Sequence, residues 1–374
     1  MKRILIIQNQ PDSEIGGIES YNRKLTKIIN KNFNNVIIDK VAIYHGNSEL
    51  NKNCLKSTNY YFVQSKKYKE NLNLFNWIIS IFKSRKFIYK LCSKNKYDLI
   101  IDSTMITYKK LFLNNNYWWV QHQTPQYYSH DFYKGFKKIL IKIGCLFLGV
   151  KNNLYFVKNL VLYDKDNYDY VIKKRDTFFN YELIPLCCAV PTDYLSTLNK
   201  ECLFRKKIIY LGRIDDKQKN IKLLIELNKK LNLIDFYGSG SEVLIKELGN
   251  NYKGVILNNE NKLKIISKYK YMILVSNYEG FSFSLVEALA CGVPIVVRDT
   301  FISARYLADN NKNGLLIQNS LDFDEFLIQL KKIYNISDFE YSILCKNAYS
   351  FALHNLNDNI FESHWLNILN KYLI

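Results

Sequence analysis

Short β-branched apolar runs alternate along the chain with longer stretches in which apolar residues recur at helical spacing. Ile4–Ile7 is the first such run, and helical spacing follows from Ile18 to Ile29. Further buried strands are expected at Val36–Tyr44, Tyr97–Ser103 and Tyr117–Gln121. Strands that alternate with helices indicate βαβ units and hence a parallel sheet.

The alternation begins again in the second half. Strands are expected at Lys207–Leu211, Ile234–Tyr237, Tyr271–Ser276 and Ile295–Val297, with helices from Asn220 and over Ser284–Cys291. Gly292 is well placed to end the second helix, with Pro294 beyond it. A proline-containing stretch near 184–205 separates the two halves. We therefore predict two α/β domains, residues 1–190 and 191–354.

Composition fits a packed globular protein and narrows the choice of partners. The 374 residues are 48% hydrophobic, and 53 Lys and Arg against 34 Asp and Glu give a net charge of +19. Such an excess favours anionic partners. The basic residues are spread along the chain, whereas a nucleic-acid site would concentrate them, so we expect no nucleic-acid partner.

Other segments exclude further classes. The 8 cysteines include no Cys-x-x-Cys, so zinc sites and disulfide frameworks lack support and reduced buried thiols are expected. The N-terminal apolar run is too short for a signal peptide, and no stretch approaches the ~20 apolar residues of a membrane span. We expect a cytoplasmic protein.

Two glutamates, Glu279 and Glu287, flank the start of a predicted helix in the segment NYEGFSFSLVEALACGVPIVV. The loop leaves the carboxyl end of a strand, where ligands bind in open α/β sheets. Gly280 allows close backbone approach, and the helix N-terminus favours a phosphate. The alternatives are structural: Ser284 and Glu287 fit a capping box, and Glu279 fits a solvated loop carboxylate.

Arg213 and Lys219 follow the strand that opens the second half, in LGRIDDKQKN. Two cations at the carboxyl end of a strand can clamp a diphosphate. The alternative is an exposed basic loop that is partly paired with Asp215 and Asp216.

Three weaker signals lie in the first half. Gly16-Gly17 joins a strand to a helix, but neither a Gly-x-Gly-x-x-Gly fingerprint nor a P-loop is present. A lone histidine is more often structural than catalytic, but His122 directly follows a strand, and that place strengthens the case for a functional role. Asp164-Lys165-Asp166 has the Asp-x-Asp form of a metal site, and we interpret it as a surface triplet.

Taken in the order in which they occur along the chain, these motifs resemble those of retaining GT-B-fold glycosyltransferases of the family-4 (GT4) type. The similarity rests on Gly16-Gly17-Ile18-Glu19, His122, the Arg213/Lys219 pair, the Glu279/Glu287 spacing, the run Ala-Cys-Gly-Val-Pro-Ile-Val at 290–296, and the closing helix Phe361–Leu373. The resemblance implies two Rossmann-like domains facing a central cleft. It also implies that helix 355–374 crosses back to the first domain.

The resemblance also implies roles for these residues. Arg213 and Lys219 would neutralise the donor pyrophosphate in place of a metal, and backbone amides near Phe281 and Ser282 would bind the same phosphates. Glu287 would bind the ribose and Glu279 the transferred sugar. His122 would contact that sugar, Gly16 and Gly17 would leave room for donor and acceptor, and Gly238, Leu257 and Asn258 would flank the base.

The implied reaction moves a hexose-type sugar from a nucleotide diphosphate sugar, with UDP favoured, to a glycan or polyprenyl-linked acceptor. It proceeds with retention and needs neither cofactor nor metal, and bacterial cell-surface polysaccharide or glycoconjugate synthesis is its expected setting. A sugar-nucleotide epimerase or hydrolase of similar fold is the alternative enzyme. A basic nucleic-acid-binding protein is the alternative outside catalysis.

Two basic segments raise the question of a membrane. Asn71–Lys94 and Phe132–Asn152 mix lysines with aromatic and aliphatic residues, as helices on anionic lipid do. Ordinary amphipathic helices facing a sheet give the same pattern. The resemblance favours peripheral attachment to the inner face of the cell membrane.

Overall fold

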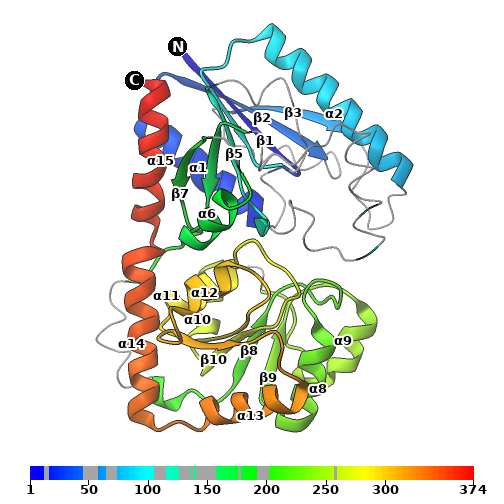
Figure 1. Cartoon of the computed structure of the whole chain (residues 1–374), viewed down its shortest axis with the longest axis vertical. Helices are drawn as coiled ribbons and strands as arrows, with labels where there is room; N and C mark the ends of the chain where they lie inside the picture. Colours follow the sequence, from blue (N-terminus) through cyan, green and yellow to red (C-terminus); the bar gives the residue numbers. More distant parts are fainter. Residues whose placement is uncertain are drawn as a thin grey trace. The chain divides into compact units, whose positions relative to one another are not determined.

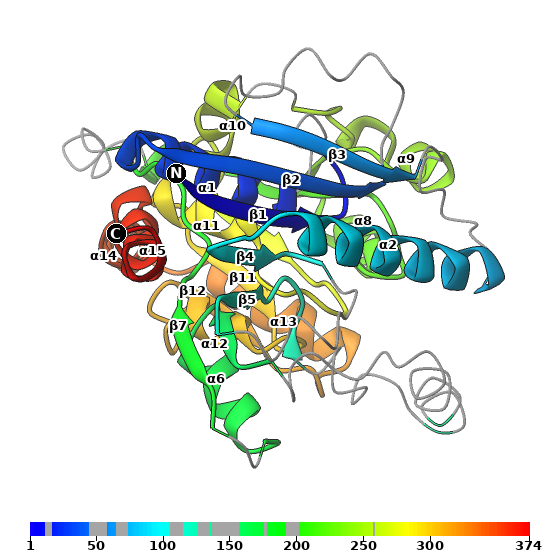
Figure 2. The same cartoon turned by 90° about the horizontal axis from the view of Figure 1, so that it is seen from above.

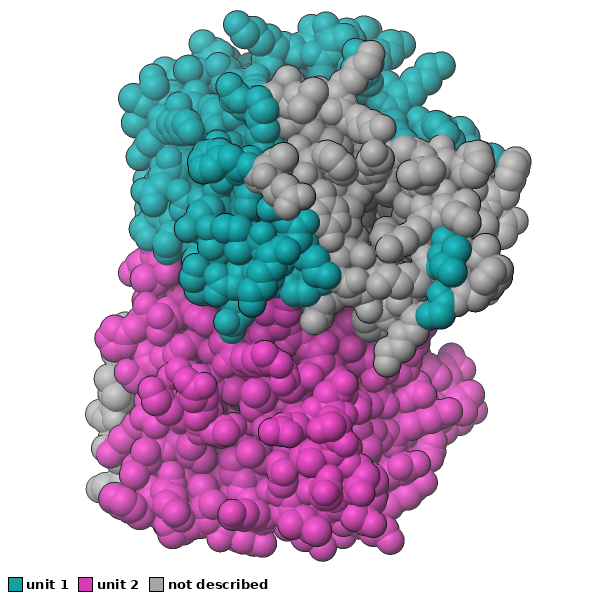
Figure 3. All heavy atoms as spheres, in the orientation of Figure 1, with its two compact units in different colours: residues 1–184, 362–374 teal, residues 185–361 magenta. Residues whose placement is uncertain are grey.

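The computed structural model describes residues 1–11, 17–44, 58–64, 74–104, 115–125, 135, 139, 157–175, 178–191, 202–256 and 259–374. The chain divides into two compact units, which Figure 3 colours separately. Unit 1 comprises residues 1–184 and 362–374, and unit 2 comprises residues 185–361.

Unit 1 is built on a parallel sheet whose described strands lie in the order β3-β2-β1-β4-β5-β6-β7 (Figures 1 and 2). The strands are β1 (Lys2–Gln8), β2 (Val36–Tyr44), β3 (Thr58–Gln64), β4 (Leu99–Asp102), β5 (Tyr117–Val120), β6 (Asn159–Leu162) and β7 (Asn180–Leu183). Its helices are α1 (Gly17–Asn32), α2 (Leu74–Lys94), α6 (Lys165–Ile172) and the part of α15 (Asp358–Leu373) from residue 362 onward.

The central strands of this sheet are apolar without alternation because helices cover both faces. On one face, Ile88 and Leu91 of α2 belong to the same buried cluster as Leu5 and Ile7 of β1. On the other face, the Trp365 indole of α15 donates a hydrogen bond of 3.1 Å to the Tyr21 hydroxyl of α1.

Unit 2 has a second parallel sheet with the strand order β12-β11-β10-β8-β9. Its strands are β8 (Ile208–Leu211), β9 (Ile234–Tyr237), β10 (Tyr271–Leu274), β11 (Ile295–Arg298) and β12 (Gly314–Ile317). The α-helices that accompany them are α8 (Ile221–Leu231), α9 (Glu242–Leu248), α10 (Asn259–Ile266), α11 (Phe283–Ala290), α12 (Ser303–Ala308), α13 (Phe323–Tyr334) and α14 (Asp338–Asn355). β8 and β10 are neighbours, so the loops after them leave the same edge of the sheet.

The predicted α/β organisation is confirmed in both units, and most of the expected strands are present within a residue or two of their expected ends. The pattern missed four strands, namely β3, β6, β7 and β12. β7 reads Asn-Tyr-Glu-Leu and lies at the edge of its sheet, where polar residues are tolerated. A polar edge strand therefore carries little of the hydrophobic signal that reveals a central one.

Candidate active site

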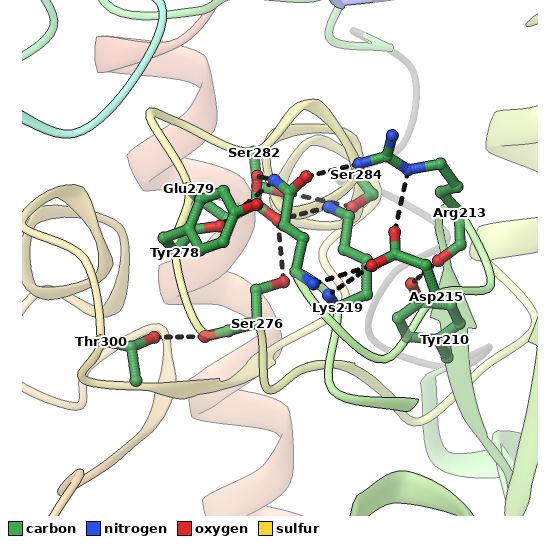
Figure 4. A network of polar contacts seen from close by, with 11 residues as sticks. Tyr210, Arg213, Asp215, Lys219, Ser276, Tyr278, Glu279, Ser282, Ser284 and Thr300 are labelled. Carbon is green, nitrogen blue, oxygen red and sulfur yellow. Dashed lines mark hydrogen bonds and ion pairs between the residues drawn. The ribbon is translucent and has the colours of Figure 1, made fainter. Parts of the chain in front are cut away.

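Two loops of unit 2 meet beyond the carboxyl ends of β8 and β10 (Figure 4). The backbone N–H of Asn277 donates to the carbonyl of Gln218 at 2.7 Å, and the Asn277 side chain donates to the carbonyl of Lys217 at 3.1 Å. These bonds fasten the loop that carries Arg213 and Lys219 to the loop that carries Glu279. The two motifs that the sequence singled out thus form one site.

Glu279 is the best-anchored residue of this site and is only 7% exposed. Its Oε1 atom contacts the Lys219 ammonium and accepts a hydrogen bond of 2.8 Å from the Ser276 hydroxyl. Its Oε2 atom accepts a bond of 3.2 Å from the Gln218 amide. A buried carboxylate with this many donors is held in one orientation. The predicted alternative, a solvated loop carboxylate, is wrong.

Arg213 lies on the same loop as Lys219 but is more open to solvent, with 54% of its side chain exposed. Its Nε lies 2.9 Å from Oδ2 of Asp215, and its Nη2 donates to Oε1 of Gln218. Pairing with Asp215 was the structural alternative, and it is observed. The same pairing holds an exposed guanidinium beside the Gln218 amide that bonds to Glu279, so it also orients a cation at the site.

Helix α11 presents its N-terminus to this region without a side-chain cap. Ser282 is the N-cap residue, but its hydroxyl lies 3.0 Å from the Ser284 hydroxyl and does not cap the helix. The first amides of a helix have no partner within it, and they favour an anion. The predicted capping box of Ser284 and Glu287 is wrong, because the helix begins one residue before Ser284 and Glu287 lies in its second turn.

Glu287 is 8% exposed, and its Oε1 atom lies 2.5 Å from the Nζ atom of Lys262 on α10. Sequence reasoning missed Lys262. The only signal for it in the sequence was its place shortly after Leu257 and Asn258, which were expected to flank a base. Leu257 and Asn258 themselves lie outside the described residues. The pair places a second carboxylate on α11, with a fixed cation beside it.

Three further residues of the predicted site belong to the loops around this edge. Gly280 and Phe281 are buried, and the Phe281 ring lies 6.1 Å from that of Tyr306. Gly238 has φ +144°, and a Cβ there would lie 1.7 Å from the carbonyl oxygen of Gly212. Its glycine is therefore required by the close approach of two strand ends, whatever it contacts in a ligand.

The remaining predicted residues fall in unit 1 or outside the described residues. Gly17 opens α1, whereas Gly16 is not described. His122 follows β5 and its Nδ1 lies 3.0 Å from the Tyr163 hydroxyl, while its buried Nε2 has no hydrogen-bond partner in the described chain. Burial lowers the pKa of His122 to about 3, so its imidazole is neutral at physiological pH.

Asp164 corrects another expectation. It is 3% exposed and caps α6, where its carboxylate accepts from the Asn167 backbone at 2.8 Å, so the Asp-x-Asp triplet is only partly a surface feature. Over the described ranges, no cluster of His, Cys, Asp or Glu could hold a metal ion. Helices long and apolar enough to cross a membrane are likewise absent from the part of the chain described.

The sequence and the fold of this chain are similar to those of known glycosyltransferases. Residues 203–349 match the family described as "Glycosyl transferases group 1". The chain is 28% identical over 226 residues to the "UDP-N-acetylglucosamine--peptide N-acetylglucosaminyltransferase GtfA subunit" of Streptococcus agalactiae, a match covering 53% of this chain and 42% of that protein. The match to the family includes the loops that carry Arg213, Lys219, Glu279 and Glu287.

A second relative is the "N-acetylgalactosamine-N,N'-diacetylbacillosaminyl-diphospho-undecaprenol 4-alpha-N-acetylgalactosaminyltransferase" of Campylobacter jejuni, 32% identical over 161 residues, which are 38% of this chain and 44% of that protein. Both matches span less than half the length of the relative. Among solved structures, sucrose-phosphate synthase from Thermosynechococcus elongatus superposes with a TM-score of 0.75 at 14% identity, covering 99% of each chain. This agreement confirms the predicted GT-B fold.

Proposed function

We propose that this protein is a retaining glycosyltransferase. The proposal starts from two findings: residues 203–349 match the glycosyl transferases group 1, and the chain has the GT-B fold. Its donor would be a nucleotide diphosphate sugar carrying a hexose-type sugar, with UDP as the carrier. Its acceptor would be a glycan or a polyprenyl-linked glycan of the cell surface. The relatives' names support these choices, since one is named for UDP-N-acetylglucosamine and the other for a diphospho-undecaprenol acceptor.

The observation that carries the proposal is the fixed Glu279 carboxylate at a place where cations and a free helix N-terminus meet. Breaking a sugar–phosphate bond builds negative charge on the leaving diphosphate. In this proposal Arg213, Lys219 and the first amides of α11, which carry positive charge or partial charge at this site, stabilise the leaving diphosphate without a metal. Because Lys219 and Gln218 hold Glu279 rigidly, its carboxylate can bind a sugar hydroxyl with little reorganisation.

Glu287 serves the other end of the donor in this proposal. An ionised carboxylate only accepts hydrogen bonds, so its natural partners are the hydroxyls of a ribose. His122 is neutral and can therefore bond to a sugar hydroxyl without opposing positive charge at the anomeric carbon. In the proposed reaction the acceptor attacks on the face that the diphosphate leaves, and the departing phosphate oxygen takes the acceptor proton.

The experiment is a donor screen on the purified chain. UDP-, GDP- and ADP-sugars are first compared by thermal shift, because a ligand that binds only the folded state raises its stability. The donor that binds is then offered with cell-surface glycan or polyprenyl-linked acceptors, in buffer with and without a chelator, and the anomeric configuration of the product is read by NMR. Transfer that is abolished by the chelator would contradict the metal-free mechanism, and turnover without acceptor to an epimer would select the epimerase alternative.

We also propose that the protein works at the cytoplasmic face of the cell membrane, through α2. One face of this helix is buried, with Ile81, Ser84, Ile88 and Leu91 toward the core of unit 1. The opposite face carries exposed aromatic rings, Phe82 at 53% and Tyr89 at 49%, among exposed lysines at 83, 86 and 90. An aromatic and basic outer face fits anionic lipid better than water alone.

Phe132–Asn152 lies almost wholly outside the described residues, so α2 is the segment to test. Flotation with vesicles of anionic and of neutral lipid should show binding to the anionic ones at low salt. Replacing Lys83, Lys86 and Lys90 by glutamate should abolish it. Equal binding by that variant, or indifference of the native protein to anionic vesicles, would remove the membrane from the proposal.

A further inference from the structure

A groove of about 310 Å³ lies in unit 1 between the edge strand β7 and helix α15, which run side by side in Figure 1. Its volume falls at the lower end of the range of about 300–1,000 Å³ that is typical of small-molecule sites. We call it the β7–α15 groove. It is lined by Trp118, Phe178, Phe179, Asn180, Tyr181, Glu182, Asn367, Ile368 and Lys371.

The polar groups of the β7–α15 groove are largely uncommitted. Within the described chain, Glu182 accepts no hydrogen bond, and the Nδ1 atom of His364 lies 4.0 Å from its Oε2 atom. That Nδ1 atom is itself buried and makes no hydrogen bond to any described group. Burial raises the pKa of Glu182. With 31% of its side chain exposed, the Glu182 carboxylate is open to hydrogen-bond donors from a ligand in the groove.

Lysine and amide side chains face the same groove from α15. Lys371 forms no ion pair with a described residue and lies 5.7 Å from the Tyr372 ring, and Asn367 has no hydrogen bond in the described chain. Asn180 differs, because its amide donates to Asn159 at 2.8 Å. The groove therefore offers a carboxylate acceptor, an ammonium donor and an amide that is both.

Aromatic rings complete the lining. Trp118 is 4% exposed and forms part of the floor, its indole fixed by a bond of 3.1 Å to the Tyr372 hydroxyl. Phe178 is 89% exposed and lies at the rim, in water. A ring so exposed leaves a face against which apolar C–H groups can pack.

The balance of these groups selects the chemical class of the ligand. An anion would meet Glu182, a cation would meet Lys371, and a purely apolar ligand would leave both unsatisfied. A neutral polyhydroxyl compound satisfies all of them, because each hydroxyl both donates and accepts and the C–H face of a sugar ring packs on an aromatic ring. We propose that the β7–α15 groove binds a neutral saccharide segment.

The place of the groove suggests what such binding would do. Trp118 and Asn180 lie in the amino-terminal halves of β5 and β7, whereas His122 follows the carboxyl end of β5. The groove thus runs along the edge strand β7, whereas the predicted sugar contact in this unit lies beyond the carboxyl end of β5. Resting on the proposed function for the identity of the partner, the groove would hold sugar units of a glycan acceptor far from the reacting end.

The test is ligand-observed NMR on the full chain with neutral pentasaccharides built from glucose, N-acetylglucosamine, galactose and N-acetylgalactosamine. At least one should bind, and Phe178→Ala and Asn367→Ala should each weaken it about tenfold. Phe339→Ala is the matched control, because Phe339 is also highly exposed, at 74%, but belongs to unit 2. Glu279→Ala should bind the pentasaccharide like the native protein, which separates this site from the proposed donor site.

Binding that persists in both groove variants, or no binding of any pentasaccharide, would overturn the inference. A change of oligomeric state in Phe178→Ala, seen by light scattering, would also overturn it and mark the groove as a protein interface. Sugar transfer without groove binding would leave the proposed function standing alone. Groove binding in a protein that transfers no sugar would overturn the proposed function but keep the saccharide site.

Discussion

Oε1 of Glu287 lies 2.5 Å from Nζ of Lys262, and both side chains are mostly withdrawn from water, at 10% and 22% exposure. The pair joins α10 to α11, and it holds one of the two carboxylates that we assign to the donor. A buried ion pair adds little net stability compared with apolar residues, but leaving one member alone is expensive. Its place in this site is therefore better explained by orientation of Glu287 than by stability.

The first prediction follows from that asymmetry. Lys262→Met leaves the Glu287 carboxylate without its cation and should lower the free energy of unfolding by about 2 kcal/mol. The double variant Lys262→Met/Glu287→Met should recover most of the loss, and chemical denaturation of the four proteins gives the coupling. If the two single losses simply add in the double variant, the two side chains are not coupled in solution.

Arg213→Ala should lower turnover by about 10²–10³-fold, because a cation that stabilises the leaving diphosphate acts mainly in the transition state. Arg213 is half exposed, so the free energy of unfolding should change by less than about 0.5 kcal/mol. Initial rates and thermal unfolding measure the two effects. Arg213→Lys keeps the positive charge but loses the forked donors of the guanidinium, so its turnover should lie between those of the native protein and Arg213→Ala. Native initial rates in Arg213→Ala would refute the assignment.

Glu279→Ala should lose most turnover and also some stability, because Lys219 is only 14% exposed and would lose its counter-charge. We expect a cost of about 2 kcal/mol, small enough for the chain to stay folded. Glu279→Gln retains an acceptor for the Ser276 hydroxyl and should be more stable than Glu279→Ala while being similarly inactive. Circular dichroism and initial rates together check this, and full activity of Glu279→Gln would show that the negative charge is not needed.

Gly238 separates a backbone requirement from a ligand contact. Gly238→Ala would place a Cβ 1.7 Å from the Gly212 carbonyl oxygen, so the strand ends must move apart, and we expect a loss of more than about 3 kcal/mol. Gly249→Ala is the control, because Gly249 also has positive φ, +53°, but nothing lies within 4 Å of the added carbon. Its backbone, with φ +53° and ψ −131°, strains an L side chain without any clash, so the variant should cost only about 1–3 kcal/mol. Similar denaturation midpoints for the two variants would mean that the strand ends tolerate a side chain.

The sequence was most informative where one signal dominated. Central strands such as β1 and β8 contain continuous apolar runs, and that pattern alone reveals them, although β1 extends beyond its run to Lys2 and Gln8. The candidate site was predicted through the resemblance to GT4 glycosyltransferases, since Arg213, Lys219 and Glu279 each had a structural alternative and only their joint order along the chain carried that resemblance. Their meeting at Gln218 depends on the adjacency of β8 and β10, which a one-dimensional pattern does not contain.

Other features had no signal in the sequence. Lys262 is one lysine among many, and its pairing with Glu287 depends on how α10 packs on α11. The capping box was wrong because the N-cap is Ser282 and not Ser284, so the helix starts at Phe283 and Glu287 lies too far along it to complete the box. The β7–α15 groove combines β7 with a helix about 190 residues further along the chain, so neither local spacing nor composition could indicate it.

His122 gives the last prediction, through the linkage between protonation and folding. Burial lowers its pKa to about 3, whereas an unfolded chain has a value of about 6.5. Between these values the unfolded state binds a proton that the folded state does not, so stability is complete above about pH 6.5 and falls as the pH drops towards 3. From pH 7.5 to pH 5 this amounts to about 2 kcal/mol. His122→Gln cannot take up that proton, so its denaturation midpoint should fall less over the same interval, and parallel curves for the two proteins would show that His122 titrates normally.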